Sequence, residues 1–260
     1  MAVTDHYGGS AQGWAGGAAH VYGPLAADLV AAVPHPVAGR TVLDAGAGTG
    51  LVSAALAAAG AHAVAVDLSP DMLRWRAAQR PPAVVGELGR IPLRTASVDD
   101  ALAAFVLNHL PEPVPALREL ARVTRTGGAV LATVYANSFV SPLRNRIDEV
   151  AFAHGFAYPE WYRVLKEEWA PRLGTVELMA AAARAAGLAD TAAEEYTAEL
   201  GLDRAEDLVD YRFGQAHCRE WIATLPARRR EELRATAIAA IEPIMVPYRP
   251  GVIRLLSRAP

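Results

Sequence analysis

Three glycines at alternate positions, Gly46, Gly48 and Gly50, lie between an apolar run that ends at Asp44 and the alanine-rich run Leu51 to Ala59. Glycine permits positive φ, and because it has no Cβ atom it lets a ligand approach the backbone. A helix that starts after such a turn directs its free N–H groups at that ligand. The pattern predicts a cofactor-binding turn, and a purely structural strand-to-helix turn is the alternative that it leaves open.

A carboxylate at the end of the next apolar run fits the same site. Asp67 follows Val64 to Val66 and lies about 20 residues beyond the glycine turn, where a carboxylate can accept hydrogen bonds from ribose hydroxyls. Ser69, Pro70 and Asp71 are residue types typical of a helix start. We therefore interpret Asp67 as a ribose ligand, in preference to a solvated loop acid.

The motifs VLDAGAGTG (residues 42–50) and VAVDLSPDML (64–73) resemble the first two motifs of the class I S-adenosylmethionine-dependent methyltransferases. The resemblance covers residues 20–135, and its later part is similar to the ubiquinone and menaquinone branch. It implies an α/β fold: a Rossmann-like, seven-stranded, mostly parallel sheet with helices on both faces and a helical cap. It also implies S-adenosyl-L-methionine as cofactor, S-adenosyl-L-homocysteine as product and no metal.

The resemblance assigns a set of cofactor-binding residues at the carboxyl ends of the strands. They are Tyr22, Asp44, Ala45, Gly46, Gly48, Gly50, Asp67, Leu68, Met72, Gly86, Glu87, Leu88, Ala104, Phe105 and His109. Glu87 and Leu88 stand where the family commonly has Asp-Ala. Contact with adenine through the Glu87 carboxylate and contact through the backbone of Glu87 and Leu88 both remain open.

Two histidines are candidate catalytic bases. His109, in the Asn-His-Leu-Pro segment that the family shares, is one. Methyltransferases with very different substrates carry this histidine. We therefore expect His109 to pack beside the cofactor or to cap the next helix, in preference to acting as a base. His217, beside Cys218, is the second, with a surface histidine at a helix end as the alternative.

Aromatic residues that precede and follow this core are candidates for binding the methyl acceptor. The predicted substrate-binding residues are Tyr7, Trp14, Tyr135, Tyr158 and Trp161. Residues 1–19 are rich in glycine, which suits a flexible segment more than a packed element. Tyr7 and Trp14, together with Tyr22, are candidate lid residues, and a partly ordered terminus is the alternative. Pockets are lined mainly by apolar and aromatic side chains, so the enrichment predicts an apolar or aromatic acceptor. Some of these rings must instead pack the cap onto the core.

Periodicity, glycine and proline divide the remaining chain into elements. We predict helices at 25–33, 51–59, 113–123, 175–186, 203–213 and 226–241. The first two predicted strands end at residues 43 and 66, and the others span 83–88, 101–107, 129–135, 192–200 and 252–256. We expect the last of them to be an antiparallel edge strand. The chain is predicted to be one domain, residues 1–260. Its parts are the N-terminal lid and first helix (1–33), the cofactor-binding core (34–136), the cap (137–172) and the C-terminal part of the core (173–260).

Composition narrows the functional classes. The 260 residues carry a net charge of −3, without the basic excess that nucleic-acid binding requires. The single cysteine and the dispersed histidines give no metal-ligand spacing. No apolar run is long enough to span a membrane. We expect a cytoplasmic protein, a monomer or homodimer, whose partner is a small molecule.

The sequence therefore predicts a small-molecule methyltransferase, with an O- or N-acceptor favoured and a C-acceptor open, and secondary metabolism as one setting. The alternative is a binding or cyclisation protein on the methyltransferase fold that transfers no methyl group. An NAD(P)-dependent oxidoreductase ranks below both, because the G-x-G-x-G spacing differs from the dinucleotide fingerprint.

Overall fold

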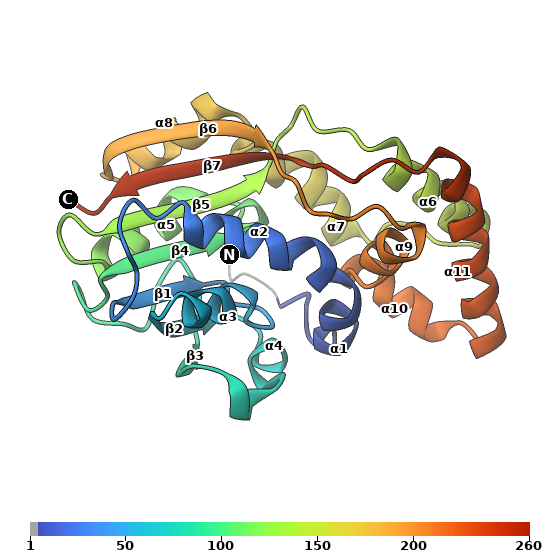
Figure 1. The fold of residues 1–260 in the computed structure, drawn as a ribbon, viewed down its shortest axis with the longest axis horizontal. Coiled ribbons are helices and arrows are strands. Elements are labelled where there is room, and N and C mark those ends of the chain that lie inside the picture. The colour runs from blue at the N-terminus through green and yellow to red at the C-terminus, as the bar shows by residue number, and fades with distance from the viewer. Residues whose placement is uncertain (1–4) are drawn as a thin grey trace.

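Seven strands form one sheet in the order β3-β2-β1-β4-β5-β7-β6 in this computed structural model, which describes residues 5–260 (Figure 1). The first four residues of the predicted N-terminal segment lie outside the described residues. The strands are β1 (Thr41–Ala45), β2 (His62–Asp67), β3 (Ala83–Val85), β4 (Asp100–Ala104), β5 (Ala129–Tyr135), β6 (Ala189–Thr197) and β7 (Gly251–Arg258). Strands β1 to β5 are parallel, and β7 is antiparallel to both of its neighbours. The predicted fold class is confirmed.

Helices cover both faces of the sheet because its central strands are apolar on both sides. On one face α2 (Ala19–Ala31) and α3 (Leu51–Ala58) pack against β1 and β5. On the other face lie α5 (Pro113–Val123) and α8 (Val176–Ala185). Leu117 and Leu120 of α5 are fully buried, and burial of a side chain of this size stabilises the fold by about 1.5–3 kcal/mol.

Strand β7 lies inside the sheet, so its predicted place at the edge is wrong. It pairs with β5 from Ala129 to Tyr135 and with β6 on its other side. The edge strand is β6, in which polar residues alternate with half-buried ones, whereas most of the apolar side chains of β7 are buried. The more apolar strand, β7, therefore lies inside the sheet, where its side chains are covered, and the more polar β6 lies at the edge, where it is partly solvated.

Strand β4 ends at Ala104, three residues before its predicted end. Phe105 has a φ of +53° and turns the chain into a single 3₁₀ turn, Leu107–His109. A bulky residue rarely adopts a positive φ, and such strain often accompanies a functional site. The turn directs the Phe105 side chain into the helical side of the molecule, where it contacts Tyr22 and Tyr135.

The glycine-rich N-terminal segment is helical, so its prediction as a flexible segment is wrong for the described part. A short α1 (Ala11–Gly13) continues through a π-helix (Trp14–Ala18) into α2. A Cβ atom on Gly17 would lie 2.1 Å from the Asp210 carbonyl oxygen. Gly17 thus serves close packing against a neighbouring helix, since glycine alone allows that approach. Helix α2 also includes Pro24 and begins earlier than residue 25.

The helical cap is larger than residues 137–172. It contains α6 (Pro142–Ala153), α7 (Glu160–Val164), α9 (Ala205–Phe213), α10 (Ala216–Thr224) and α11 (Ala227–Ile241), which lie together beyond the ends of the central strands (Figure 1). Side chains of α6, α9 and α11 share one apolar cluster with the N-terminal helices. Two separate segments of the chain, one on each side of α8 and β6, therefore build the cap.

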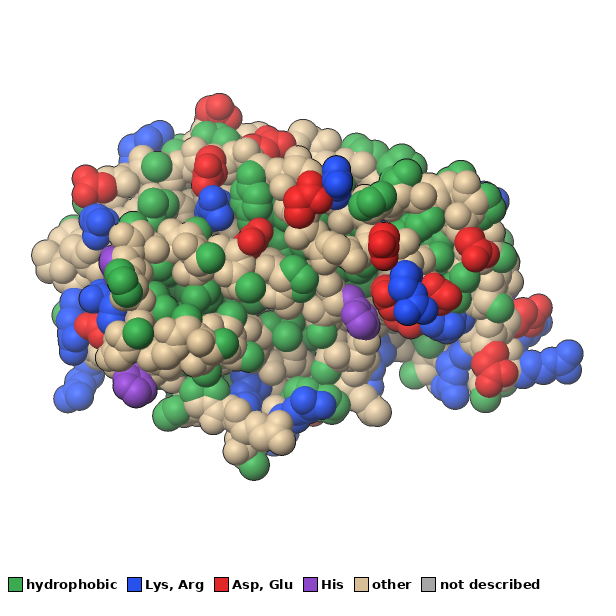
Figure 2. All heavy atoms as spheres, viewed as in Figure 1, with side chains coloured by type: hydrophobic (Ala, Val, Ile, Leu, Met, Phe, Trp, Pro, Cys, Tyr) green, Lys and Arg blue, Asp and Glu red, His purple; other side chains and the backbone are tan. Residues whose placement is uncertain are grey.

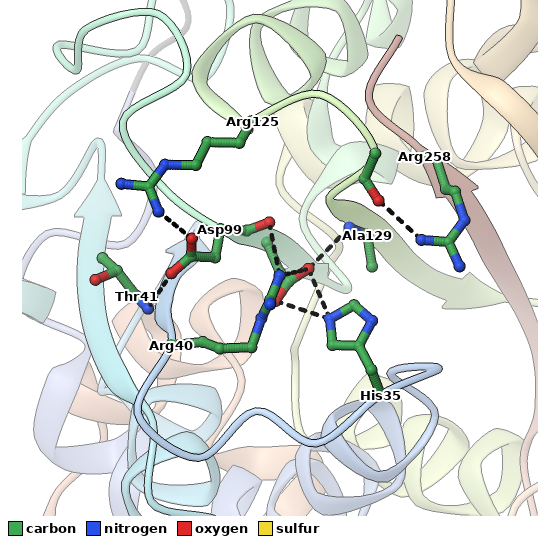
Figure 3. Close-up of polar contacts among 9 residues, drawn as sticks. His35, Arg40, Thr41, Asp99, Arg125, Ala129 and Arg258 are labelled. Atoms are coloured by element: carbon green, nitrogen blue, oxygen red, sulfur yellow. Dashed lines mark hydrogen bonds and ion pairs between the residues drawn. The ribbon is translucent and has the colours of Figure 1, made fainter.

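A polar network fastens the amino ends of β1, β4 and β5, far from the glycine turn along these strands (Figure 3). Asp100, fully buried, accepts hydrogen bonds from Arg40 at 2.7 Å, from His35 at 3.0 Å and from the Ala129 amide at 2.8 Å. These bonds outweigh the effect of burial and lower the pKa of Asp100. The adjacent Asp99 accepts the Thr41 amide and pairs with Arg125.

The short helices between these elements complete the fold. They are α4 (Pro70–Arg74), a 3₁₀ turn (Ala77–Gln79), a π-helix (Leu165–Trp169) and the 3₁₀ turns Ala170–Arg172 and Glu242–Ile244. On the face shown in Figure 2, positive and negative side chains are interspersed with apolar ones over both the sheet and the cap.

Candidate functional site

The glycine turn has the geometry that its spacing predicts. Gly46, Gly48 and Gly50 have φ angles of +72°, +51° and +94°. The Gly48 amide donates to Asp67 Oδ2 at 2.7 Å, and the Ser69 amide donates to Asp67 Oδ1 at 2.8 Å. Burial raises the pKa of Asp67, and the two amides oppose that rise. The turn after β1 and the carboxylate after β2 therefore form one cradle.

Asp44, the residue before the last of β1, links the strand to the start of α3. Its side chain is 1 % exposed, and Oδ2 accepts the Ser53 amide at 2.8 Å and the Ser53 hydroxyl at 2.6 Å. Burial raises its pKa to about 6, although the Ser53 bonds lower it. These bonds satisfy a free amide in the first turn of α3. Asp44 thus fixes the angle between β1 and α3, and its place among the cofactor ligands stays a prediction.

The other predicted cofactor residues differ in how they can meet a ligand. Ala45 and Leu88 are buried in the core, Met72 is 3 % exposed, and Glu87 is exposed. A Cβ on Gly86 would lie 2.5 Å from Pro92, so packing alone explains that glycine. These positions leave open whether the Glu87 side chain touches a cofactor.

Arg80 is a residue at this turn that the sequence analysis missed. Its Nη1 donates to the Gly48 carbonyl at 3.0 Å and to the Met72 carbonyl at 2.7 Å. Its Nε and Nη2 are buried without a partner in the described chain, and burial lowers its pKa. Arg80 braces the turn against α4. An arginine after the helix and before Pro81 gives no sequence signal of that role.

Beside the cradle, a cavity of about 440 Å³ lies between the carboxyl ends of β4 and β5 and the cap. It brings together residues predicted from distant parts of the sequence: Tyr7, Trp14, Tyr22, Phe105, His109, Tyr135, Trp161 and His217. Trp14 stacks on Tyr22 at 5.1 Å between ring centroids, and Phe105 lies 4.7 Å from Tyr135. Rings from the N-terminal helices and the sheet therefore form a continuous wall, as a pocket for a flat apolar molecule requires.

Tyr158 lies outside the lining of this cavity. Its hydroxyl donates to Asp148 Oδ2 at 2.7 Å, within a buried ion pair that the sequence analysis did not find. Arg212, 1 % exposed, donates through Nε and Nη2 to the two Asp148 oxygens, each at 2.7 Å, and through Nη1 to Gln215. The pair ties α6 to α9 directly behind the cavity. Nothing in the local sequence pairs residues 148 and 212.

His109 lines the cavity at the end of β4, and its Nδ1 lies 3.1 Å from the Tyr7 hydroxyl. Burial raises the pKa of Tyr7 and lowers that of His109 to about 4, so both groups are neutral at pH 7. With Tyr7 as donor, the imidazole proton lies on Nε2, and His109 can donate there but cannot accept. The cap of α5 is Glu112, which removes the alternative that His109 caps that helix.

His217 is 4 % exposed, so its alternative as a surface histidine is wrong. Its ring stacks on Tyr162 at 3.7 Å, and its Nε2 is buried without a partner in the described part of the chain. Burial, helped by Arg212, Arg144 and Lys166, lowers its pKa well below the usual value. The imidazole is therefore neutral; the residue lines the cavity, and its Nε2 is itself enclosed by protein.

Within residues 5–260, no group of three or more His, Cys, Asp and Glu side chains could hold a metal ion. No helix in that range is both long enough and apolar enough to cross a membrane.

Comparison with known proteins agrees with this geometry. Residues 43–132 match the family model described as "Methyltransferase domain". The demethylmenaquinone methyltransferase of Mycobacterium bovis is 35 % identical over 137 residues, a match that covers 50 % of this chain and 58 % of that protein. The chain thus spans just over half the length of this curated relative.

Two solved structures share the fold. Phosphoethanolamine N-methyltransferase 2 of Haemonchus contortus, in complex with phosphomonomethylethanolamine and S-adenosylhomocysteine, gives a TM-score of 0.59 at 18 % identity, covering 91 % of this chain and 52 % of that one. The [4+2]-cyclase SpnF gives 0.54 at 17 % identity, covering 94 % and 82 %. Residues 43–132 are therefore similar to a methyltransferase domain, and the sheet order and these neighbours show that the chain has the Rossmann-like fold of class I methyltransferases.

Proposed function

We propose that this protein transfers a methyl group from S-adenosylmethionine to a small aromatic or apolar molecule. The observation that carries the proposal is that the cradle and the aromatic cavity share one edge of the sheet. The glycine turn follows β1, Asp67 ends β2, and the cavity lies at the ends of β4 and β5, where open α/β sheets bind their ligands. Phe105 and His109 line the cavity after β4, the strand next to β1.

The residues of the cradle fit this cofactor. The turn exposes backbone at three positions of positive φ, and Asp67 offers a carboxylate for ribose hydroxyls. Asn108 is 8 % exposed and lines the cavity, and its Oδ1 is buried without a partner in residues 5–260. That oxygen can accept a hydrogen bond from the amino group of the methionine part. The family's other predicted contacts at Leu68, Met72, Gly86 to Leu88 and Ala104 complete the proposed site.

When bound in the cradle, S-adenosylmethionine would supply an electrophilic methyl group. An acceptor atom would take this group, and the electron pair of the broken bond would stay on sulfur. The chain orients the acceptor and excludes water, and orientation of this kind can supply roughly 7–11 kcal/mol. Tyr22, Phe105 and Tyr135 form the wall that excludes water. No metal is required for such a displacement.

An acceptor hydroxyl or protonated amine must also lose a proton. The neutral His217, with its unpartnered Nε2 in the wall, can accept that proton, whereas the Nδ1 of His109 is occupied by Tyr7. A base of this kind contributes about 10²- to 10⁴-fold to the rate. This assignment favours an O- or N-acceptor. A C-acceptor stays open, and so does a setting in secondary metabolism.

A second candidate function is a cyclisation catalysed in the cavity without methyl transfer. The shared fold with the [4+2]-cyclase SpnF supports it, because that protein is described as a cyclase. In that case the cofactor would bind without being consumed.

Calorimetric titration with S-adenosylhomocysteine and with NADH tests the cofactor assignment. We expect micromolar binding of S-adenosylhomocysteine, typical of such cofactor sites, and no heat of binding for NADH. Binding of NADH but not of S-adenosylhomocysteine would contradict the cofactor assignment and favour an oxidoreductase.

A further inference from the structure

Two cationic side chains line the cavity without a counterion. Arg144, on α6, forms no ion pair within residues 5–260, and its Nε is buried there without a hydrogen-bond partner. Lys166, in the π-helix Leu165–Trp169, lines the cavity while part of its side chain is exposed. Among the described residues that line the cavity, none is Asp or Glu. The empty space therefore faces two positive charges and no negative one.

The carboxylate nearest to Arg144 along its helix is already used. Asp148 lies four residues further along α6, a spacing at which an arginine and an aspartate can pair. Both of its oxygens are instead bound by Arg212, and one also accepts the Tyr158 hydroxyl. The buried pair is complete without Arg144, which consequently keeps its full charge.

The tyrosines around the cavity do not neutralise that charge either. Burial raises the pKa of Tyr22 to about 12, and it raises those of Tyr135, Tyr211 and Tyr248 as well. All four hydroxyls are protonated at pH 7. An arginine stays charged in proteins, and Arg144 is half-buried, so water solvates its charge only in part. A ligand with a negative group would supply the missing partner.

We propose that the acceptor is an aromatic carboxylic acid, and that Arg144 and Lys166 bind its carboxylate within the aromatic cavity. This inference rests on the proposed function and names its substrate class. The planar guanidinium can hold a carboxylate through two parallel hydrogen bonds. The ring of such an acid would lie among Tyr22, Phe105 and Tyr135, with its nucleophilic group left free to face the methyl donor.

Paired ligands that differ only in charge test the proposal. Calorimetry compares 4-hydroxybenzoate with 4-hydroxybenzamide, and 4-hydroxycinnamate with its amide, in the presence and in the absence of saturating S-adenosylhomocysteine. We expect at least one acid to bind about ten- to a hundredfold more tightly than its amide, because charge-assisted hydrogen bonds are lost in the amide. The titrations without S-adenosylhomocysteine measure anion binding even if the cofactor assignment fails.

Three variants localise the effect. Arg144→Met should remove most of the preference for the acid, and Lys166→Met, at a partly exposed position that the fold tolerates, should reduce it. Arg146→Met is the matched control, because Arg146 lies on the same helix and pairs with the exposed Glu149. The control should keep the preference of the unmodified protein. The affinity for S-adenosylhomocysteine, measured on each variant, shows that the fold and the cradle are intact.

Three results would overturn the proposal. One is failure of every acid to bind, and the second is equal binding of acids and amides by the unmodified protein. The third is a preference that survives in both Arg144→Met and Lys166→Met. A fall in S-adenosylhomocysteine affinity in a folded Arg144→Met protein would assign Arg144 to the carboxylate of the cofactor instead, and would also contradict the proposal.

Discussion

The contact between the Gly48 amide and the Asp67 carboxylate joins the two motifs on which the cofactor assignment depends. Asp67→Ala should weaken binding of S-adenosylhomocysteine by about 1.5–3 kcal/mol, the usual cost of losing hydrogen bonds to a charged group. Gly48→Val should abolish binding, because a β-branched side chain is strained at the φ of +51° found there and would fill space that the ligand needs. Calorimetry measures both. Unchanged affinity in either variant would remove that residue from the site.

His109 should make stability depend on pH in a definite direction. Its pKa is about 4 in the folded protein, below the usual value near 6.5, so the unfolded chain binds more protons between these values. Stability must therefore fall as the pH drops below about 6.5. Asp44 has a raised pKa and acts in the opposite direction.

A comparison with His109→Asn isolates the histidine from Asp44. Relative to this variant, the unmodified protein should lose about 2 kcal/mol of unfolding free energy between pH 7 and pH 5. Urea unfolding at both pH values measures it, and a variant at the exposed His62 serves as control. Parallel pH profiles for the unmodified protein and His109→Asn would show that His109 is not buried in its neutral form.

Among the helices, the ion pair between Asp148 of α6 and Arg212 of α9 stabilises the packing of the cap. Arg212→Met should destabilise the protein by about 3–5 kcal/mol, because it leaves a buried carboxylate without its partner. The double variant Asp148→Leu with Arg212→Met should recover most of that loss. Thermal unfolding tests this, with Arg234→Met, from an exposed pair with Asp210, as control. A fully stable Arg212→Met protein would show that the pair does not fasten the cap.

Local sequence predicted those elements whose signals are local. Helix α5 and strand β5 have the predicted bounds, since prolines, a Gly-Gly turn and apolar periodicity mark them. The end of β4 was misplaced, because the positive φ of Phe105 is imposed by tertiary packing and leaves no pattern in the sequence. Gly17 was misread for a related reason, since glycine serves both flexible segments and close helix contacts.

The candidate site shows the same division. The cradle residues could be predicted because a short motif places them on consecutive strands and turns. Arg80, Arg144 and Arg212 were missed, since each acts through partners that lie elsewhere in the chain or in a ligand. Tyr158 was assigned to the substrate because enrichment in aromatic residues does not distinguish a cavity wall from the packing behind it.

In the molecule as a whole, the polar network that stabilises the sheet and the candidate functional site lie at opposite ends of the strands. The Asp100 network holds the amino ends of the strands (Figure 3), while the cradle and cavity lie at their carboxyl ends. Asp100→Asn should therefore cost about 2–4 kcal/mol of unfolding free energy, yet leave the affinity for S-adenosylhomocysteine within about twofold.

Urea unfolding and calorimetry measure these two quantities separately. Glu149→Gln, which removes an exposed pair with Arg146, should change stability by less than about 0.5 kcal/mol and is the control. A large loss of cofactor affinity in folded Asp100→Asn protein would show that the two ends are coupled.

Methyl transfer is tested most directly with S-adenosylmethionine labelled in its methyl group. The protein is incubated with this cofactor and a panel of phenols, aromatic acids and amines, and mass spectrometry quantifies both products. We expect one labelled methyl group on an acceptor for each S-adenosylhomocysteine formed. Tight cofactor binding without S-adenosylhomocysteine formation across the whole panel would contradict this expectation and favour the cyclisation function.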